Sequence, residues 1–553
     1  MMKPSYDVVI IGSGFGGSIP AMRLARAQQA AGKPVSVCVL EKGKRYNLGE
    51  FPRSFTKPKD WFWRKEGEGG WKGLVDFRAF HNISVGCASG VGGTSLIYLD
   101  VQIEAFDSDF QIGVPEGRPR WPQSIANWKA ELAPYYRMME QMLHPTPIPE
   151  PNLKARALKA GASGIGAADR FRLLDLAIYW GQNGSEPGLF HPDPYHWGGP
   201  PQYGCANCGE CFIGCNTHSK NTLDLNYLWF AERQGAEVYS QHKVLAITPR
   251  DAGYRIDFKD LRWGFEGSVL AGKVIVAGGC LGSTELLLRA KHGFKRDGKT
   301  WPATLPRISD MLGQYFSGNG DFGAVGFETR RLINPMDGPT ITATLEYAEQ
   351  LNNRGFIIED GGFPDILRAN LRQDPFGQSA GRRLIRFLKR VVGLLTEPPL
   401  AQGIFEQLDY EAVRDAIPYL VMGSDAADGV MSIGEDGALQ IDWSHTKSMP
   451  LWRTIETTLR TLTESPQGLD GNLMLNPTWS AQKQLVTVHP LGGCPMGDDV
   501  KNGVVDVNGE VFNYPNLFVT DASVIPTAVG PNPSKTIGAN AERISKKIIE
   551  RGI

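Results

Sequence analysis

The chain has 553 residues and a formal net charge of −1, and 42% of its residues are hydrophobic. The length indicates more than one domain, the composition is that of an ordinary globular protein, and the near-zero charge argues against nucleic-acid binding, which calls for a basic surface. We expect neither a secretory signal nor a membrane-spanning helix, and therefore a cytoplasmic protein whose eight cysteines are thiols or metal ligands.

The first predicted unit is a strand, a glycine-rich turn and a helix. Residues 7–11 form a β-branched run that is typical of a buried parallel strand, and the motif G-x-G-x-x-G follows from residue 12. Such glycines let the backbone approach a pyrophosphate, which the helix N-terminus then binds. A second strand, 35–40, ends at an acid placed to bind a ribose hydroxyl. The predicted dinucleotide contacts are Gly12, Gly14, Phe15, Gly16, Gly17 and Glu41.

The second glycine-rich segment covers residues 86–95. It contains too many small residues for a helix interior, where each glycine costs about 1 kcal/mol. We therefore expect backbone that lies against a flat ligand, which favours FAD over NAD. The contacts predicted here are Gly90, Gly92, Gly93, Thr94 and Ser95.

Four cysteines follow within residues 205–215, at the spacing C-x2-C-x2-C-x3-C. This spacing matches an iron–sulfur run of bacterial ferredoxins, although Asn216 replaces the usual proline. Three interpretations stay open: an iron–sulfur cluster, a zinc site, and buried or redox-labile thiols without metal. The candidate ligands are Cys205, Cys208, Cys211 and Cys215.

A basic segment at residues 382–395 interleaves five Lys or Arg residues with apolar ones at helical spacing. Helices of this kind lie on anionic membrane surfaces, which predicts a peripheral membrane contact. A solvated amphipathic helix that packs on its own domain is the commoner alternative.

Five motifs occur in a fixed order along nearly the whole chain. They are the first glycine motif with Glu41, the loop at 90–95, the segment 277–283 after a Val-Ile-Val strand, His489-Pro490, and Asp521-Ala522-Ser523 leading to Asn532-Pro533. In these motifs the chain resembles the glucose–methanol–choline (GMC) oxidoreductases, and within them the bacterial cholesterol-oxidase-like and long-chain alcohol oxidase branch.

The resemblance implies oxidation of an alcohol to a carbonyl by hydride transfer to FAD, with oxygen or another electron acceptor. The branch implies a small lipophilic alcohol, either a sterol or a long-chain alcohol. A sugar or polyol dehydrogenase of the same family is the nearest alternative. A flavin-dependent lyase, a fatty-acid photodecarboxylase and a non-catalytic FAD-binding protein are further alternatives on the same scaffold.

The resemblance also assigns the chemistry to two side chains near the C-terminal end of the sequence. His489 is the general base or hydrogen-bonding group, since the pKa of a histidine lies near working pH. Asn532 lies beside the flavin and the substrate oxygen, as a neutral dipole. The alternative for His489 is a structural histidine in a Pro-Gly turn. Further cofactor-binding residues implied by the resemblance are Val244, Ala277, Gly278, Asp521, Ala522, Asn532 and Pro533.

Two residues of the family pattern have no counterpart that the sequence alone identifies. Where many relatives have an asparagine after the flavin loop, this chain has Ile97-Tyr98. A third catalytic group of cholesterol oxidases is a glutamate from the substrate domain, and Glu346, Glu359 and Glu406 are all candidates by region.

The predicted fold class is α/β. We expect a Rossmann-like FAD-binding domain of the GMC and glutathione-reductase type, assembled from residues 1–110, 205–300 and 485–553. A second, substrate-binding domain on an antiparallel sheet would be formed by residues 111–204 and 301–484.

Overall fold

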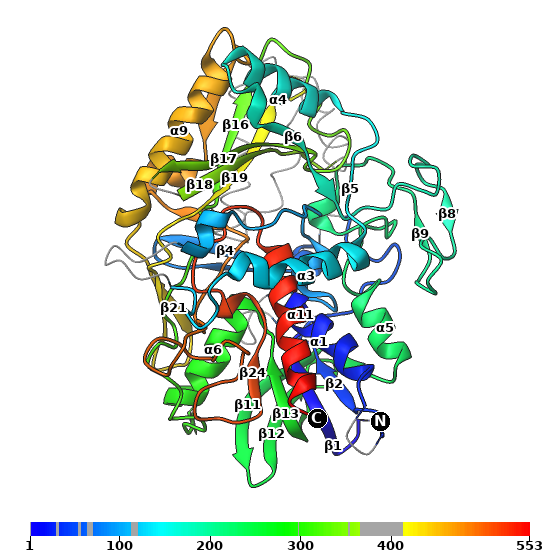
Figure 1. The fold of residues 1–553 in the computed structure, drawn as a ribbon, viewed down its shortest axis with the longest axis vertical. Coiled ribbons are helices and arrows are strands. Elements are labelled where there is room, and N and C mark those ends of the chain that lie inside the picture. Colours follow the sequence, from blue (N-terminus) through cyan, green and yellow to red (C-terminus); the bar gives the residue numbers. More distant parts are fainter. Residues whose placement is uncertain are drawn as a thin grey trace.

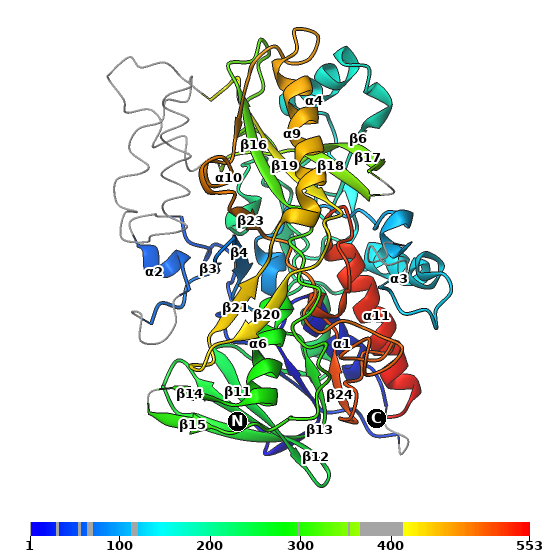
Figure 2. The same ribbon diagram turned by 90° about the vertical axis from the view of Figure 1, so that its left-hand side faces the viewer.

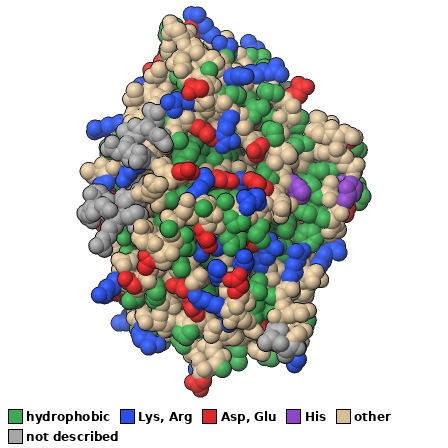
Figure 3. Space-filling view, in the orientation of Figure 1, with side chains coloured by type: hydrophobic (Ala, Val, Ile, Leu, Met, Phe, Trp, Pro, Cys, Tyr) green, Lys and Arg blue, Asp and Glu red, His purple; other side chains and the backbone are tan. Residues whose placement is uncertain are grey.

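The structure is a computed structural model that describes residues 2–28, 32–53, 57–63, 70–111, 120–296, 298–351, 354–364 and 413–553. Two large sheets follow one another along the long axis of the molecule, each with its own helices (Figures 1 and 2). On the face drawn in Figure 3, acidic and basic side chains are interspersed rather than gathered by sign, as the small net charge leads one to expect.

The lower sheet has seven strands in the order β10-β2-β1-β13-β12-β11, and β24 also pairs with β13. β10, β2, β1, β13 and β24 run parallel, whereas β12 and β11 are antiparallel additions. The apolar run of β1 is fully covered, because parallel strands are packed on both faces. The bounds are β1 Ser5–Ile11, β2 Val37–Leu40, β10 Glu237–Tyr239, β11 His242–Arg250, β12 Gly253–Asp260, β13 Glu266–Val276 and β24 Leu517–Val519.

Helices from both ends of the chain cover this sheet. α1 (Phe15–Ala25) packs between α5 (Tyr227–Arg233) and α11 (Ser534–Glu550), and α11 packs in turn on α3 (Trp128–Leu143) (Figure 1). A partly buried ion pair joins α1 to α11, with Arg23 Nε 2.6 Å from Glu542 Oε2. α6 (Gly279–His292) follows β13 and leads toward the hairpin of β20 and β21 (Figure 2).

The upper sheet is antiparallel and has six strands in the order β22-β16-β19-β18-β17-β6. α9 (Met449–Glu464) lies along it and buries Leu451, Ile455, Leu459 and Leu462, a spacing that places these side chains on one helix face. α4 (Leu153–Gly164) packs near β17 and β18. The bounds are β6 Phe171–Leu173, β16 Phe322–Phe327, β17 Ala343–Leu351, β18 Arg354–Asp360, β19 Ile417–Gly423 and β22 Asn472–Leu475.

A small sheet lies between the two large ones. In it β4 pairs with β3 antiparallel and with β23 in parallel (Figure 2). The mixed α/β architecture with a second, antiparallel sheet confirms the predicted fold class. The remaining bounds are α2 Pro58–Trp61, β3 Val75–Ala79, β4 Ile83–Ala88, η1 Gly93–Leu96, η2 Asp107–Gln111, β5 Thr146–Pro147, η3 Ala168–Arg170, β7 Asp175–Leu176, β8 Phe190–His191, β9 Gln202–Tyr203, η4 Cys211–Ile213, β14 Phe294–Arg296, β15 Lys299–Trp301, β20 Val430–Ile433, β21 Leu439–Asp442, η7 Thr446–Ser448, α10 Pro477–Gln482, β23 Leu485–Thr487 and η8 Ala522–Val524.

Two predictions concern membranes: that no helix spans one, and that the basic segment contacts one at its surface. Among the helices of the described ranges, none is both long and apolar enough to cross a bilayer. The basic segment 382–395 lies outside the described residues.

Candidate active site

The glycines of the first motif bring three backbones into contact. Gly12 has φ +102°, and a Cβ atom on it would lie 2.2 Å from the carbonyl oxygen of Ala277, just after β13. A Cβ atom on Gly17 would lie 2.1 Å from the carbonyl oxygen of Gly12. Only glycine fits at either position, and the turn therefore sits tightly at the carboxyl edge of the sheet, where nucleotides bind in folds of this type.

The acid at the end of β2 lies at the same edge. Glu41 is 6% exposed, and its Oε2 accepts hydrogen bonds from the backbone N and the Oγ of Ser13, at 3.1 and 2.7 Å. The backbone N of Gly43 donates to Oε1 over 2.7 Å. Burial raises the pKa of Glu41, and these hydrogen bonds oppose the rise. The carboxyl group is thus held in place at the cavity wall, as a ribose-binding acid requires.

The second glycine segment touches the first. Gly93 has φ +60°, and a Cβ atom on it would lie 2.5 Å from Cα of Gly14. The two segments are also joined through Ser13, whose Oγ accepts a hydrogen bond from the backbone N of Gly92 over 3.1 Å. Two chain segments that are far apart in sequence therefore form one continuous backbone cradle.

This cradle predicts a large effect of a small substitution. Gly93→Ala is expected to deplete bound FAD, because the new Cβ displaces the Gly14 backbone and the positive φ adds strain of roughly 1–3 kcal/mol. The flavin absorbance per protein of the purified variant measures it. Gly323→Ala is the matched control, since a Cβ there meets nothing within 4 Å. Full flavin content in Gly93→Ala would contradict the cradle.

One cavity of about 1520 Å³ is lined by residues of both glycine motifs and of the C-terminal motifs. Four predicted residues do not line it: Gly17, Gly90, Gly92 and Ser95, which pack behind its wall. The predicted residues that do line it are Gly12, Gly14, Phe15, Gly16, Glu41, Gly93, Thr94, Val244, Ala277, Gly278, His489, Asp521, Ala522, Asn532 and Pro533.

Asp521 follows β24 and ties the cavity floor together. Its Oδ2 accepts hydrogen bonds from the backbone N of Gly279, over 2.7 Å, and from the hydroxyl of Ser283. Its Oδ1 accepts from the backbone N of Ser523 over 2.9 Å. A Cβ on Gly16 would lie 2.6 Å from Cβ of Asp521. The carboxylate therefore joins α6 to η8, while the Cα and Cβ of Asp521 pack against Gly16 at the start of α1.

His489 and Asn532, the two residues predicted to carry the chemistry, line the same cavity. Nδ1 of His489 lies 2.8 Å from Oδ1 of Asp321, on the loop before β16. Nδ2 of Asn532 lies 3.5 Å from Oε2 of Glu359 and 3.5 Å from the sulfur of Met422. Asn532 Oδ1 is buried and has no hydrogen-bond partner among the described residues. The Oδ1 atom of Asn532 can therefore accept a hydrogen bond from a ligand in the cavity.

The structure distinguishes the three glutamate candidates. Glu359 on β18 is fully buried, lines the cavity and leaves Oε1 without a hydrogen-bond partner among the described residues. Burial raises its pKa well above the usual value, and the contact with Asn532 only partly opposes this. Glu346 is paired instead with Arg172, away from the described cavity lining. Glu406 lies outside the described residues.

Asp321 was not predicted from the sequence as a site residue. Its signal is the short pattern Ser-Gly-Asn-Gly-Asp at 317–321, which indicates a tight turn before a strand but not a partner for a distant histidine. Glu359 carries no local signal at all, because only the register of β18 and β19 brings it to Asn532.

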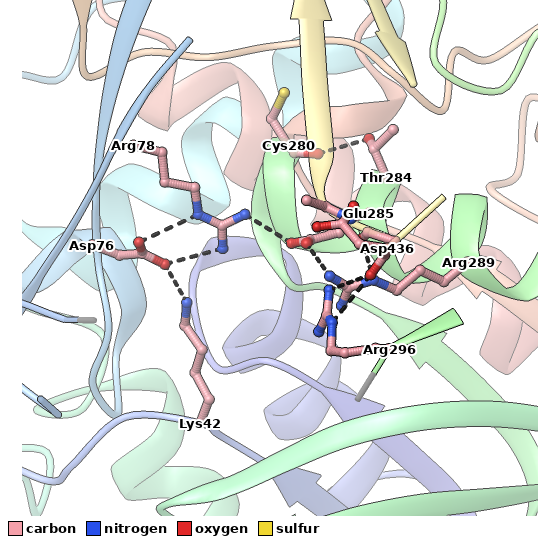
Figure 4. Close-up of polar contacts among 11 residues, drawn as sticks. Lys42, Asp76, Arg78, Cys280, Thr284, Glu285, Arg289, Arg296 and Asp436 are labelled. Carbon is pink, nitrogen blue, oxygen red and sulfur yellow. Dashed lines mark hydrogen bonds and ion pairs between the residues drawn. The ribbon is translucent and has the colours of Figure 1, made fainter. Parts of the chain in front are cut away.

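A chain of charges forms one wall of the cavity (Figure 4). Lys42 Nζ lies 2.6 Å from Asp76, which also pairs with Arg78 on the same strand, β3. Arg78 Nη1 then reaches Glu285 on α6 over 2.7 Å, and Glu285 pairs with Arg289 one turn further. Burial raises the pKa of Asp76, but the charges of Arg78 and Lys42 outweigh it and hold the pKa below its usual range.

The cysteine segment does not match the predicted metal site. Its four cysteines line a separate cavity of about 20 Å³, room for about one water molecule and not for a cluster. Burial raises the pKa of Cys208 to about 11 and that of Cys211 well above the usual value, so both are protonated thiols at neutral pH. Among the described residues no group of three His, Cys, Asp or Glu side chains is placed to hold a metal ion. Of the three interpretations, the structure therefore gives no support to the iron–sulfur cluster or the zinc site.

A lysine ties the cysteine segment to the flavin loop. Lys220 Nζ donates to the carbonyl oxygens of Cys211, Tyr98 and Leu96, at 2.8, 2.7 and 3.2 Å. Tyr98 lines the cavity and donates its hydroxyl to the carbonyl oxygen of Asn221. The segment thus supports the wall behind the flavin loop.

Comparisons with known proteins find one family and several oxidases to which the chain is similar. Residues 441–541 match the family described as GMC oxidoreductase. A cholesterol oxidase of Mycobacterium tuberculosis is 29% identical, with 98% of this chain and 91% of that protein covered. The long-chain-alcohol oxidase FAO1 of Arabidopsis thaliana is 25% identical over 62% of this chain and 46% of that protein. A fungal aryl-alcohol oxidase shares the fold, with a TM-score of 0.59, 14% identity and full coverage of both chains.

The fold and the site define an oxidoreductase that acts on the CH–OH group of an alcohol. The predicted resemblance is confirmed: residues 441–541 match the GMC oxidoreductase family, and the chain is similar to cholesterol oxidases and long-chain-alcohol oxidases. GMC oxidoreductases depend on FAD, and the cavity fits that cofactor. Gly93 leaves no space for a Cβ against Gly14, Glu41 follows the second strand, and Asn532 Oδ1 has no hydrogen-bond partner among the described residues.

Proposed function

We propose that the protein oxidises a lipophilic alcohol, either a sterol or a long-chain alcohol, to the corresponding carbonyl compound. The observation that carries this proposal is the wall that the upper sheet contributes to the cavity. It presents mainly apolar side chains from three strands, β16, β19 and β22, which suit a hydrocarbon body. These side chains are Phe322, Ala324, Val325, Tyr419, Leu420, Val421, Met422, Met474 and Leu475.

The same wall is less suited to binding a sugar or polyol. A site for a polyhydroxylated substrate needs several hydrogen-bonding groups, since each hydroxyl taken from water without a partner weakens binding. On the described part of this wall Tyr419 contributes a hydroxyl, and that hydroxyl already contacts Thr463 at 2.9 Å. This favours the lipophilic alcohol over the sugar.

The roles of the residues follow from their positions. Bound FAD supplies the hydride acceptor. His489 takes the hydroxyl proton of the alcohol at Nε2, because Nδ1 is engaged by Asp321. Asn532 orients the substrate oxygen, and protonated Glu359 beside it keeps a second negative charge out of the buried site. Apolar surroundings exclude water from these groups.

The proposal also divides the chain into the two domains expected from the sequence. The seven strands of the lower sheet all come from residues 1–110, 205–300 and 485–553, which supports their assignment to FAD binding. All six strands of the upper sheet come from 111–204 and 301–484, which supports their assignment to the substrate.

The visible spectrum of the anaerobic holoprotein tests the proposal. Sterols, long-chain alcohols and sugars are added in turn, and we expect the flavin bands to bleach with one of the first two classes. Hexane-extracted buffer and a ketone of the same carbon skeleton are the controls, since neither carries a CH–OH group. Bleaching by sugars alone would contradict the proposal, as would loss of a fatty acid under blue light with no bleaching by any alcohol.

A further inference from the structure

A loop before β16 connects the two segments that carry His489 and Asn532. Ser317 on this loop exchanges two backbone hydrogen bonds with Leu491, each 3.0 Å long. The loop turns sharply, with Asn319 at φ +53° and Gly320 at φ +62°. A Cβ on Gly320 would lie 2.3 Å from the carbonyl oxygen of Gly423, so the turn is confined between two strands.

Asp321, at the end of this loop, contacts three consecutive residues of the segment that carries His489, residues 487–489. Besides His489 Nδ1 at Oδ1, its Oδ2 accepts the hydroxyl of Thr487 over 2.8 Å and the backbone N of Val488 over 2.9 Å. Two donors at Oδ2 are the pattern of an ionised carboxylate, which only accepts. We therefore assign the proton of the Nδ1 contact to His489.

Asn319, two residues earlier, holds the asparagine segment in the same way. Its Oδ1 accepts the backbone N of Val529 over 2.9 Å, and its Nδ2 donates to the carbonyl oxygen of Pro531 over 2.8 Å. Pro531 immediately precedes Asn532, so the side chain of Asn319 sets the turn from which Asn532 reaches the cavity. Asn319 is fully buried and makes these contacts away from solvent.

A second carboxylate anchors the loop from behind without touching either segment. Asp425 accepts the hydroxyl of Ser317 over 2.8 Å and the backbone N of Gly320 over 2.9 Å. It is buried and follows β19. Asp425 therefore fixes the loop on one side. On the other side, Asn319 contacts the segment that carries Asn532, and Asp321 contacts His489.

We propose, on the basis of the function proposed above, that Asp321 is a positioning residue that selects the working tautomer of His489. By accepting the Nδ1 proton it leaves Nε2 unprotonated and ready to take the proton of the substrate hydroxyl. During the reaction the O–H bond of the alcohol breaks and an Nε2–H bond forms, while the Nδ1 proton stays on the ring and Asp321 stays ionised. The negative charge of Asp321 then stabilises the imidazolium.

The neighbouring titratable groups do not take over this role. Glu359 on β18 is a second carboxyl group near the site, and its burial raises its pKa well above the usual value, which favours the neutral form. Asp425 contacts Ser317 and Gly320 rather than the ring of His489. The hydroxyl of Tyr419 on β19 is turned toward Thr463. Asp321 is thus the ionised group that hydrogen-bonds the ring of His489 within the described residues.

Asp321→Asn in the holoenzyme is the direct test. The rate of anaerobic flavin reduction by the best alcohol is followed from pH 5 to 9. We expect it to fall by roughly 10²-fold or more, since the amide no longer selects one tautomer. We also expect the rising limb of the pH profile to move to lower pH, because loss of a nearby negative charge lowers the pKa of a histidine.

Asp425→Asn is the matched control, since it removes a buried carboxyl group that holds the same loop from behind without a contact to His489. We expect it to lower thermal stability and to leave the rising limb where it is. A role of Asp321 in loop structure alone would give both variants the same unshifted profile and would overturn the proposal.

A second measurement separates this proposal from the proposed function. In protein labelled with ¹⁵N-histidine, the signals of His489 are assigned by their absence in His489→Ala. We expect the Nδ1–H tautomer in the wild type and a mixture in Asp321→Asn. If no alcohol reduces the flavin but the tautomer shifts as expected, the proposed function fails and the positioning role stands. If alcohols reduce the flavin but the tautomer does not depend on residue 321, the positioning role fails.

Discussion

Replacing His489 by alanine is expected to slow flavin reduction by about 10²–10⁴-fold, the usual contribution of a positioned acid–base group. The side chain lines the cavity and contacts Asp321, so the variant loses the proton acceptor. The groups that hold the dinucleotide lie on other elements, and FAD content is therefore expected to remain near that of the wild type. Stopped-flow absorbance under anaerobic conditions measures the rate, and the flavin-to-protein absorbance ratio measures the content.

His81→Ala is a suitable control for this variant. His81 is an exposed histidine in the turn between β3 and β4, and the described cavity lining does not include it. We expect its rate and flavin content to match the wild type. A His489→Ala protein that reduces its flavin at the wild-type rate would disprove the assignment, and one that loses its flavin would indicate a structural histidine instead.

Replacing Arg78 by methionine is expected to lower the free energy of unfolding by at most about 3–5 kcal/mol, the cost of a buried charge left with no partner. Methionine preserves much of the side-chain length but removes the cation that Asp76 and Glu285 share, and these side chains are only 8% and 9% exposed. Asp76 keeps Lys42 and Glu285 keeps Arg289, so each buried carboxylate loses part of its compensation. Urea denaturation of the FAD-free protein, followed by tryptophan fluorescence, measures the difference.

The pH dependence of this loss has a definite sign. The pKa of Asp76 is depressed in the folded protein, so the ion pairs stabilise the fold above the unfolded value of about 3.9. This stabilisation is lost as the pH falls through the lower, folded pKa. The gap between wild type and Arg78→Met is therefore expected to be constant near neutrality and to shrink below about pH 4.

Arg296→Met is the control on the same wall. Arg296 donates to the backbone carbonyl oxygen of Asp436 and is partly exposed, so no buried carboxylate depends on it. We expect a loss below about 1 kcal/mol. Equal losses in the two variants would show that the charge chain of Figure 4 has no special energetic role.

The sequence allowed the cofactor end of the site to be predicted in detail because its signals are local. A strand, three glycines and a helix in one short stretch make a complete physical unit, and the structure brings Gly12, Gly14 and Glu41 to one edge of the sheet. The antiparallel second sheet was likewise expected, although from the resemblance rather than from periodicity.

Residues that act through long-range contacts were harder to predict. Asp321 lies 168 positions before His489, and Glu359 lies 173 positions before Asn532. Their roles depend on how β16, β18 and β19 register with one another, which no short pattern encodes. The cysteine run is a different case. Its spacing in the sequence is that of metal ligands, but in the structure the four cysteines surround only a small cavity.

The composition of the lower sheet has a consequence for synthesis of the chain on the ribosome. β1 is made long before β24, which begins at Leu517 and pairs with the other side of β13, the partner of β1. The helix α1 likewise precedes its packing partner α11 by a similar length of chain. At typical translation speeds this delay is on the order of a minute, during which β1 and α1 lack part of their final cover. We therefore expect that the nascent chain cannot capture FAD before β24 and α11 have been made.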